Sequence, residues 1–273
     1  MSAPRPGHAA LNALLPVVRD IARAAGEAIL AIYESREFDV ARKADETPVT
    51  AADYAAHHLI VERLATLEPR YPILSEESES IPYAERARWR TYWLIDPLDG
   101  TREFIKRNGE FTVNIALIHD HDAVLGVVHA PALDTCYFGA EGAGAWRQDG
   151  SAAARAIRVR PVPACPTVAG SRSHASPRLQ GMLERIGDHE LISMGSALKT
   201  CLVAEGAADL YPRLGLTSEW DTAAAQCVLE QAGGHLTDTD GHRLRYNTKE
   251  SLLNPHFLAF GDDSRDWAML SGD

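Results

Sequence analysis

Cysteine is scarce in this chain, and its spacing excludes two of its common uses. The 273 residues include four cysteines, and no two of them form a CxxC pair. A zinc site or a disulfide scaffold would show closer or regularly paired cysteines. Cys201 and Cys227 lie in apolar segments with helical spacing, which indicates small core residues. We therefore assign no chemistry to the cysteines.

The sequence also has no long apolar run. The opening residues MSAPRPGHAA lack the apolar stretch of a signal peptide. No segment approaches the roughly 20 apolar residues that a membrane-spanning helix needs. These absences predict a cytoplasmic protein without integral membrane association. They leave open the oligomeric state and peripheral contact with the cytoplasmic side of the inner membrane.

Basic residues are fewer than acidic residues in this chain. The chain has 27 Lys and Arg residues against 38 Asp and Glu residues, for a net charge of −11. Binding a nucleic-acid backbone requires a dense Lys/Arg surface, so we expect no nucleic-acid partner. The acidity remains compatible with a small phosphate-bearing substrate if some carboxylates hold cations, because bound cations reverse the local charge.

The pattern of apolar residues predicts an α/β protein, built as an α+β layered sandwich. Hydrophobic residues make up 45% of the chain, enough for a large core. Helical spacing predicts a helix over residues 11–33 and a second that begins at Thr50 and ends near residue 67. Strands expected at 111–119, 124–130 and 135–140 form a largely antiparallel meander.

Prolines at 161, 163 and 166 suggest a division of the chain into two domains. We predict an N-terminal α+β domain over residues 10–160 that carries an antiparallel sheet with helices and the metal site. A C-terminal α/β domain follows over residues 161–264, where strands and helices alternate. Residues 1–9 are predicted to form a flexible tail.

The segment TYWLIDPLDGTREF, residues 91–104, is the most informative in the chain. Its apolar run predicts a buried strand that stops at Asp96, because Pro97 lacks an N–H. Asp99 and Gly100 then form a turn signal, followed by Thr101. Two carboxylates, a backbone carbonyl and a hydroxyl are thus gathered at one strand end. Oxygen ligands of this kind suit a hard cation such as Mg²⁺.

Other candidate residues lie at the ends of predicted elements, and each has a plainer alternative. Asp53 would serve as a helix-capping residue, and Asp221 would favour the first turn of a helix electrostatically. Taken alone, Glu76 and Glu77 would indicate a solvated loop. Taken together, however, the acids would repel one another unless cations neutralise them. Several acids with open coordination suit a two-metal centre acting on a phosphate ester.

Two motifs give the chain a family resemblance. WLIDPLDGT and WDTAAAQCVLEQAGG resemble the two signatures of the lithium-sensitive magnesium phosphomonoesterases, which include inositol monophosphatase, fructose-1,6-bisphosphatase and bisphosphate nucleotidase. GVVHAP, SRSH, GSALK and ESLLNP are similar to the bisphosphate nucleotidase branch. The resemblance covers residues 14–260 and implies an inositol-monophosphatase-like fold and sensitivity to lithium. Arg102 stands where this branch usually has lysine, which keeps the charge.

The resemblance implies a role for each acid. Glu76, Asp96 and the Leu98 carbonyl would bind one Mg²⁺, and Asp96, Asp99 and Asp221 a second; a third ion is left open. Glu77 would orient the cluster. Thr101, hydrogen-bonded to Asp53, would position the attacking water. The substrate-binding set implied by the resemblance is Glu76, Leu98, Asp99, Gly100, Thr101, Ser171, His174, Ser196, Lys199 and Asp221.

Part of that set would hold the nucleotide rather than the reacting phosphate. Ser171 and His174 in SRSH, with Ser196 and Lys199 in GSALK, match positions that bind the nucleoside and its 5′-phosphate. A surface-loop histidine is an equal alternative for His174. Lys199 in the first turn of a helix is unfavourable for the helix dipole, which favours a phosphate partner for it.

The function that the resemblance implies is removal of the 3′-phosphate from 3′-phosphoadenosine 5′-phosphate, yielding AMP. The 5′-phosphosulfate analogue is left open as a second substrate, and the reaction would clear a by-product of sulfate assimilation. One alternative is an inositol-1-monophosphatase. The other is a phosphatase-like protein that acts mainly by binding a partner. The GSALK and SRSH segments favour the nucleotide.

Overall fold

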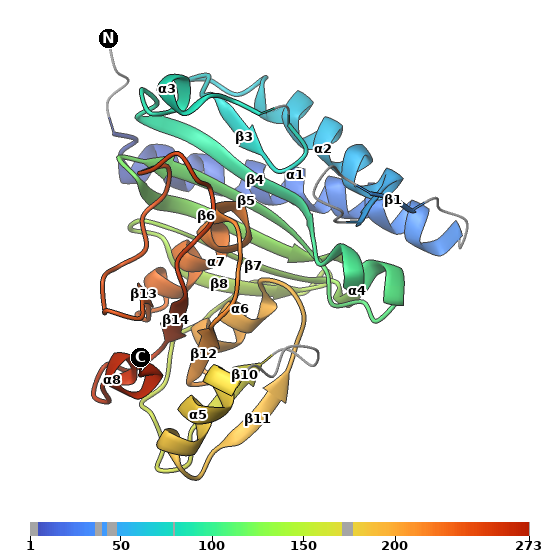
Figure 1. The fold of residues 1–273 in the computed structure, drawn as a ribbon. Helices are drawn as coiled ribbons and strands as arrows, with labels where there is room; N and C mark the ends of the chain where they lie inside the picture. The colour runs from blue at the N-terminus through green and yellow to red at the C-terminus, as the bar shows by residue number, and fades with distance from the viewer. Residues whose placement is uncertain (1–4, 36–39, 43–47, 79, 171–176, 273) are drawn as a thin grey trace.

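The computed structural model describes residues 5–35, 40–42, 48–78, 80–170 and 177–272 (Figure 1). Helices and sheets are stacked in alternating layers. Helices α1 (His8–Ser35) and α2 (Ala51–Leu64) cover one face of a seven-stranded sheet, and α6 (Leu198–Ala204) and α7 (Glu219–Gln231) lie on its other face. A five-stranded sheet follows, covered in turn by α5 (Pro177–Ile186) and α8 (Trp267–Ser271). The expected layered α/β sandwich is confirmed.

The large sheet is mostly antiparallel. Its order follows the chain: β3 (Ile73–Ser75), β4 (Thr91–Asp99), β5 (Thr112–His119), β6 (Asp122–Ala130), β7 (Thr135–Ala140), β8 (Gly144–Asp149) and β9 (Arg155–Ala156). Only the β3–β4 pair among these is parallel. Two parallel strands end at the same edge, so β3 and β4 bring their following residues together.

The smaller sheet is mixed, as expected for the C-terminal half. Its order is β11 (Glu190–Ser193), β10 (Thr167–Gly170), β12 (Leu210–Arg213), β14 (Phe257–Phe260) and β13 (His235–Asp238). Strand β10 pairs in parallel with β11 and β12, and β14 pairs antiparallel with β12 and β13. The remaining short elements are β1 (Val40–Arg42), β2 (Pro48–Thr50), α3 (Tyr83–Arg86), α4 (Thr101–Lys106) and the 3-10 turn Pro131–Leu133.

The two halves of the chain share a core. One cluster of buried side chains contains Tyr92 and Val128 of the large sheet together with Cys201 of α6 and Cys227 of α7. Helix α7 lies between the two sheets and is buried on most of its surface, which places its first turn in the interior of the molecule. The division at residue 160 stays a prediction. Helix α1 already begins at His8, within the segment expected to be a tail.

The expectation that the strand stops at Asp96 is wrong. Strand β4 continues through Pro97 to Asp99, with a shift of register between Asp96 and Asp99. Asp96 pairs with Asn114 and Asp99 with Thr112, so two residues of β4 oppose one of β5. Such a bulge leaves a residue without a ladder partner, and Pro97 therefore costs no hydrogen bond.

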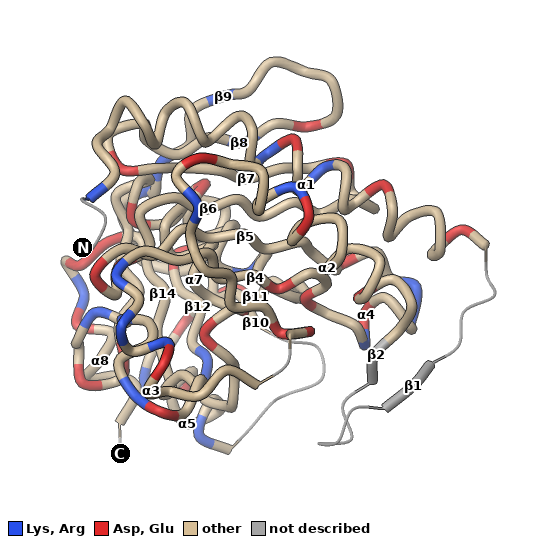
Figure 2. The backbone as a smooth tube through the Cα atoms, turned by 90° about the horizontal axis from the view of Figure 1, so that it is seen from above, with Lys and Arg blue, Asp and Glu red and all other residues tan. Residues whose placement is uncertain are grey.

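None of the described helices is both long enough and apolar enough to span a membrane. Figure 2 shows acidic and basic residues interspersed along the described chain.

Candidate metal centre and substrate pocket

Three acids from separate elements meet at the edge of the large sheet. Asp96 lies on β4 with 1% of its surface exposed, and its Oδ1 accepts the Leu98 N–H at 3.1 Å. Glu76 follows β3, and its N–H donates to the carbonyl of Ile95 at 3.1 Å. Asp221 lies in the first turn of α7. One carboxylate oxygen of each of Glu76, Asp96 and Asp221 lies within 4.8 Å of the others.

Asp99 completes the acidic group and connects it to the C-terminal half. Its Oδ2 accepts the Ala197 N–H at 2.6 Å and an Asn114 side-chain N–H at 3.4 Å. The Lys199 ammonium faces Asp99 closely enough to perturb its titration. The bulge in β4 therefore directs Asp96 toward Glu76 and Asp221, and Asp99 toward the segment before α6.

The electrostatics of this group favour a bound cation. Burial raises the pKa of Asp96 well above its usual range, and the Glu76, Asp99 and Asp221 charges raise it further. Burial raises the pKa of Asp221 in the same way, with Asp99 adding to it. Carboxylates that are both desolvated and close together are costly to ionise. Their all-oxygen ligand set fits a hard divalent metal ion, which would remove that cost.

Thr101 and Asp53 form a hydrogen-bonded pair beside the acids. The Thr101 hydroxyl lies 3.2 Å from Asp53 Oδ1 and 3.4 Å from the Leu98 carbonyl. The other Asp53 oxygen accepts the Thr50 N–H at 2.8 Å and the Thr50 hydroxyl at 2.7 Å. The expected capping box of Thr50 and Asp53 is thus confirmed, and it leaves Oδ1 directed at Thr101. Glu77 is half-buried in the turn after β3.

A cavity of about 310 Å³ opens next to Asp99 and Asp221. Lys199 lines it with only 5% of its surface exposed; its Nζ donates to the Ser196 carbonyl at 2.7 Å and lies 5.2 Å from the centre of the Tyr211 ring. Burial lowers the pKa of Lys199 to about 8. The cavity is lined by Asp99, Gly100, Arg102, Glu103, Lys106, Gly195, Ser196, Ala197, Lys199, Thr200, Tyr211, Arg213, Thr217, Asp221, Thr222 and Phe257.

The match to a sequence family decides the assignment. The model of the inositol monophosphatase family matches residues 11–262, nearly the whole chain. The chain belongs to the inositol monophosphatase family.

Curated members of this family are closely similar in sequence. A protein named 3′(2′),5′-bisphosphate nucleotidase CysQ from Salmonella typhimurium is 51% identical over 245 residues, covering 89% of this chain and 98% of that protein. The protein of the same name from Haemophilus influenzae is 38% identical over 263 residues, covering 94% and 96%. Both relatives span almost the same length as this chain.

Solved structures of the family have the same fold. The crystal structure of CysQ from Bacteroides thetaiotaomicron superimposes with a TM-score of 0.80 at 41% identity, covering 90% of this chain and 96% of that chain. Inositol monophosphatase from Anabaena superimposes with a TM-score of 0.73 at 25% identity, covering 95% of each.

The structure brings most of the predicted site residues together within this inositol monophosphatase fold. Glu76, Asp96 and Asp221 form one cluster, and Asp99 and Lys199 line the adjoining cavity. Gly100 has a φ of +93°, and an added Cβ would lie 3.3 Å from the Glu110 carbonyl, so the turn before α4 favours glycine. Ser171 and His174 lie outside the described residues.

Sequence reasoning missed residues on the cavity walls. Arg213 at the end of β12 and Tyr211 beside Lys199 both line the cavity, and the buried Nε of Arg213 has no hydrogen-bond partner among the described residues. Arg102 and Lys106 of α4 also line the cavity. The DLYPR and TREFIK segments contain the necessary cations. Their sequence gives no sign that they face a common cavity, because that depends on how α4 packs against the C-terminal half.

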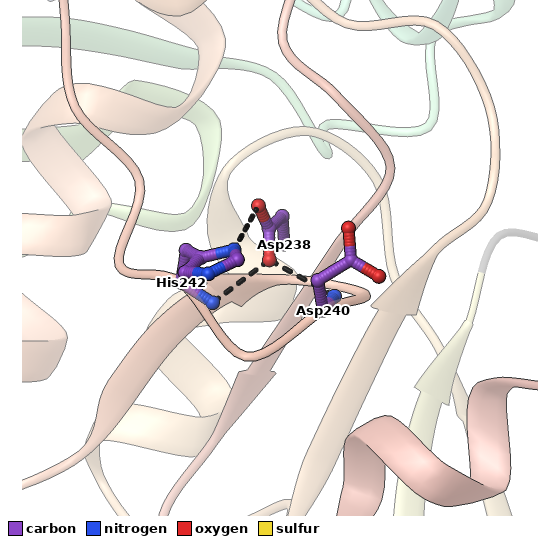
Figure 3. A group of neighbouring side chains, drawn as sticks. All are labelled: Asp238, Asp240 and His242. Carbon is purple, nitrogen blue, oxygen red and sulfur yellow. Dashed lines mark hydrogen bonds and ion pairs between the residues drawn. The ribbon is translucent and has the colours of Figure 1, made fainter.

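A second group of potential ligands lies at the surface. Figure 3 shows Asp238, Asp240 and His242 in the turn after β13. Asp238 Oδ1 accepts the backbone N–H groups of Asp240 at 2.9 Å and His242 at 2.8 Å. These hydrogen bonds account for the cluster as a stabilised turn, and we assign no ligand to it.

The stabilisation by Mg²⁺ should increase as the pH rises from about 4 to about 6. Burial raises the pKa of Asp99 to about 6, although Lys199 lowers it. Without metal, the unfolded chain loses protons in this interval that the folded chain keeps, so the free energy of unfolding falls as the pH rises. Bound Mg²⁺ would allow Asp99 to ionise in the folded chain and would therefore prevent this fall in the free energy of unfolding. The increase in melting temperature on adding Mg²⁺ should reach about 5–10 °C near neutral pH.

Thermal unfolding with EDTA or with excess Mg²⁺, measured at half-unit steps of pH, tests this expectation. Comparing the two series cancels groups remote from the centre, such as His129, whose pKa burial lowers to about 4. A stabilisation by Mg²⁺ that stays constant between pH 4 and 7 would show that the acids are not coupled to the metal.

Proposed function

We propose that this chain is a Mg²⁺-dependent 3′(2′),5′-bisphosphate nucleotidase that converts 3′-phosphoadenosine 5′-phosphate to AMP and phosphate. The observation that carries the proposal is the placement of Lys199 and Ser196 in the same cavity as Asp99 and Asp221. A substrate with two phosphates could thus place one at the acids and the other at the cation. The names of the curated relatives support the same activity.

The acidic cluster supplies ligands for two Mg²⁺ ions in this proposal. Glu76, Asp96 and the Leu98 carbonyl would hold one ion, and Asp96, Asp99 and Asp221 the other. Bound Mg²⁺ would supply positive charge to the phosphoryl oxygens and to the leaving alkoxide, and would lower the pKa of water. A third ion remains open. The raised pKa values of Asp96 and Asp221 support occupation by cations, because charge neutralisation allows both acids to ionise.

Thr101 and Asp53 would orient the water that attacks phosphorus. When the Thr101 hydroxyl donates to Asp53 Oδ1, its oxygen lone pairs are free to accept a hydrogen bond from water. Asp53 is held in turn by two donors from Thr50, which limits its rotation. Fixed hydrogen-bonding groups of this kind reduce the entropy cost of reaching the reactive geometry. Glu77 would support the position of Glu76 from the same turn.

The second phosphate would lie against Lys199, Ser196 and Arg213. The Ser196 Oγ is buried and has no hydrogen-bond partner in the described part of the chain, as is also true of Arg213 Nε. Buried polar atoms normally have partners, and a phosphate group would supply them. We extend the proposal to Ser171 and His174 for the nucleoside on the family resemblance alone.

Phosphate release from four substrates tests the proposal. We expect the highest kcat/KM with 3′-phosphoadenosine 5′-phosphate, a lower value with 3′-AMP, and very little turnover of inositol 1-phosphate, each measured with Mg²⁺ and with EDTA. Including 3′-phosphoadenosine 5′-phosphosulfate measures the preference between the two diphosphorylated substrates. Preference for inositol 1-phosphate would favour an inositol monophosphatase instead. Metal-independent or absent turnover would favour a binding protein.

Lithium should inhibit the reaction at about 0.1–10 mM. The expectation follows from the family resemblance and from the oxygen-ligand centre, where a small monovalent cation could replace one Mg²⁺ ion. Rates at fixed Mg²⁺ and rising LiCl, with KCl at the same ionic strength as the control, give the inhibition constant. Full activity at tens of millimolar LiCl would argue against a replaceable Mg²⁺ ion.

The cellular role in this proposal is removal of a by-product of sulfate assimilation. A cytoplasmic location and peripheral contact with the inner membrane stay predictions.

A further inference from the structure

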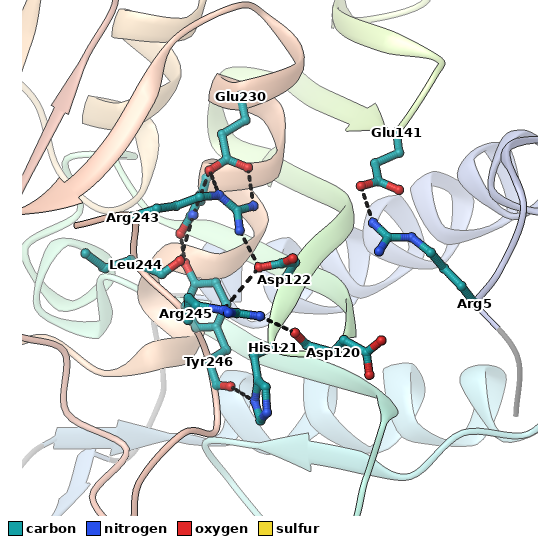
Figure 4. A network of polar contacts seen from close by, with 11 residues as sticks. Arg5, Asp120, His121, Asp122, Glu141, Glu230, Arg243, Leu244, Arg245 and Tyr246 are labelled. Atoms are coloured by element: carbon teal, nitrogen blue, oxygen red, sulfur yellow. Dashed lines mark hydrogen bonds and ion pairs between the residues drawn. The ribbon is translucent and has the colours of Figure 1, made fainter. Parts of the chain in front are cut away.

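The segment from residue 243 to residue 254 contains the first five residues of the ESLLNP motif, to which the proposed reaction assigns no role. The first part of the 243–254 segment is anchored to the turn between β5 and β6 (Figure 4). Arg243 pairs with Asp122 and with Glu230, and Arg245 Nη2 donates to the Asp120 carbonyl at 2.7 Å. Ion pairs at this end hold the segment on the large sheet.

The last part of the 243–254 segment wraps the beginning of α7. The Glu219 N–H donates to the Leu252 carbonyl at 2.8 Å, and the Asn254 N–H donates to the Thr217 carbonyl at 2.9 Å. The Asn254 side chain donates to the Ser218 carbonyl at 2.7 Å and to the Thr222 hydroxyl at 3.1 Å. The residues contacted, 217–219 and 222, lie before and after Asp221 in the sequence. The 243–254 segment therefore supports the helix turn that carries a proposed metal ligand.

Asn247 in the middle of the 243–254 segment joins α7 to α3. Its backbone N–H donates to Glu219 Oε2 at 2.7 Å, and its side-chain N–H donates to the Arg86 carbonyl at 2.6 Å. Its side-chain oxygen accepts from Arg86 Nη1 at 2.5 Å. Asn247 has a φ of +54°, a conformation that asparagine tolerates better than most residues. Arg86, Glu219 and Asn247 are each at most 2% exposed.

Arg86 is connected to the other side of the metal centre. Helix α3 comes after Glu76 in the chain, and the Arg86 N–H donates to the Pro82 carbonyl at 3.2 Å. Glu76, Arg86 and Trp220 line one cavity of about 360 Å³, together with Glu250 and Leu252 of the 243–254 segment. The buried contacts from Glu219 through Asn247 to Arg86 thus connect the first turn of α7, which carries Asp221, with a cavity that Glu76 lines.

We infer that Glu219, Asn247 and Arg86 are positioning residues that set the separation of Asp221 from Glu76 and so tune the affinity of the metal centre. The inference rests on the proposed metal-dependent function. Asp221 and Glu76 come from elements that are far apart in the sequence, so contacts outside the acidic cluster hold the two carboxylates near each other. Removing a direct hydrogen-bonded partner of a metal ligand typically lowers metal affinity by about 10–100-fold. Glu219, Asn247 and Arg86 act one contact further out, so we expect effects at or below the lower end of that range.

Two variants test the inference with little disturbance of packing. Glu219→Gln keeps the volume and an acceptor oxygen but removes the charge that faces Arg86. Asn247→Gly keeps access to positive φ but removes both side-chain hydrogen bonds. Mg²⁺ affinity is measured on the full chain by calorimetry without substrate. We expect Kd to rise about three- to tenfold in both variants, with kcat and substrate KM at saturating Mg²⁺ within about twofold of the unchanged chain.

Asp209→Asn is the matched control. Asp209 is also buried, with 3% of its surface exposed, and accepts from Arg160 Nε at 2.8 Å and from the Thr167 N–H at 2.7 Å. It directly precedes β12 of the smaller sheet, so its substitution should lower the melting temperature while leaving the Mg²⁺ Kd unchanged. A control that weakens Mg²⁺ binding equally would overturn the inference, because general destabilisation would then explain the effect.

Unchanged Mg²⁺ affinity in folded Glu219→Gln would also overturn the inference. If Asn247→Gly fails to fold, the Mg²⁺ affinity of Glu219→Gln alone decides whether the inference holds. The calorimetric readout separates the inference from the proposed function. If the unchanged chain binds Mg²⁺ but releases phosphate from none of the four substrates, the proposed function fails while the positioning role is still measured.

Discussion

Phosphate release by the Asp96→Asn variant is expected to fall by at least about a thousandfold, even at saturating Mg²⁺. Asp96 is 1% exposed and lies within the group formed with Glu76 and Asp221, where the proposal has it bridge both metal ions. An amide keeps one oxygen ligand but removes the charge, so neither ion is held as tightly. The initial rate of phosphate release across a Mg²⁺ titration measures the loss.

The fold of the Asp96→Asn variant should remain intact. Repulsion from Glu76, Asp99 and Asp221 raises the pKa of Asp96, after burial itself, so removing the charge relieves a cost of the metal-free state. The melting temperature in EDTA should equal or exceed that of the unchanged chain, while the stabilisation by Mg²⁺ should be lost. Near-normal turnover at saturating Mg²⁺ would contradict the bridging role.

Lys199→Met should lower kcat/KM for 3′-phosphoadenosine 5′-phosphate by about ten- to a hundredfold. A hydrogen bond between a charged group and phosphate contributes about 1.5–3 kcal/mol, which corresponds to that factor. Methionine is an unbranched side chain of similar length, so it fills much of the space of the lysine stem and avoids opening a cavity. The loss should be small for 3′-AMP, which has no second phosphate, because Lys199 is proposed to bind only the phosphate that is not cleaved.

The position of Lys199 beside Asp99 gives this experiment two distinct outcomes. Lys199 lowers the pKa of Asp99 and so also acts on a proposed metal ligand. Equal losses on both substrates, with weaker Mg²⁺ binding, would assign Lys199 to the metal centre instead of the second phosphate. Arg102→Gln removes a charge from the exposed wall of the same cavity, and as a control it should change both substrates by less than about threefold.

Much of the secondary structure could be predicted from local sequence. The strand predicted at 135–140 has the bounds of β7, and the strand predicted at 124–130 ends where β6 ends and begins two residues later. The capping box of Thr50 and Asp53 is also local, because both residues belong to the same helix turn. The prediction that β4 stops at Asp96 was wrong because a bulge is defined by the pairing strand, and β5 lies beyond the next helix in the chain.

For the candidate site, the sequence by itself determined the chemical types: acids at element ends, glycine and threonine after Asp99, and a lysine in GSALK. Only the tertiary structure decided which groups meet. Lys199 faces Asp99, and Arg86 reaches Glu219 through Asn247, because α6, α7 and the 243–254 segment pack against the large sheet. Such contacts join residues that are far apart along the chain. Their geometry depends on the layers that pack between them, and no local pattern of residues encodes that packing.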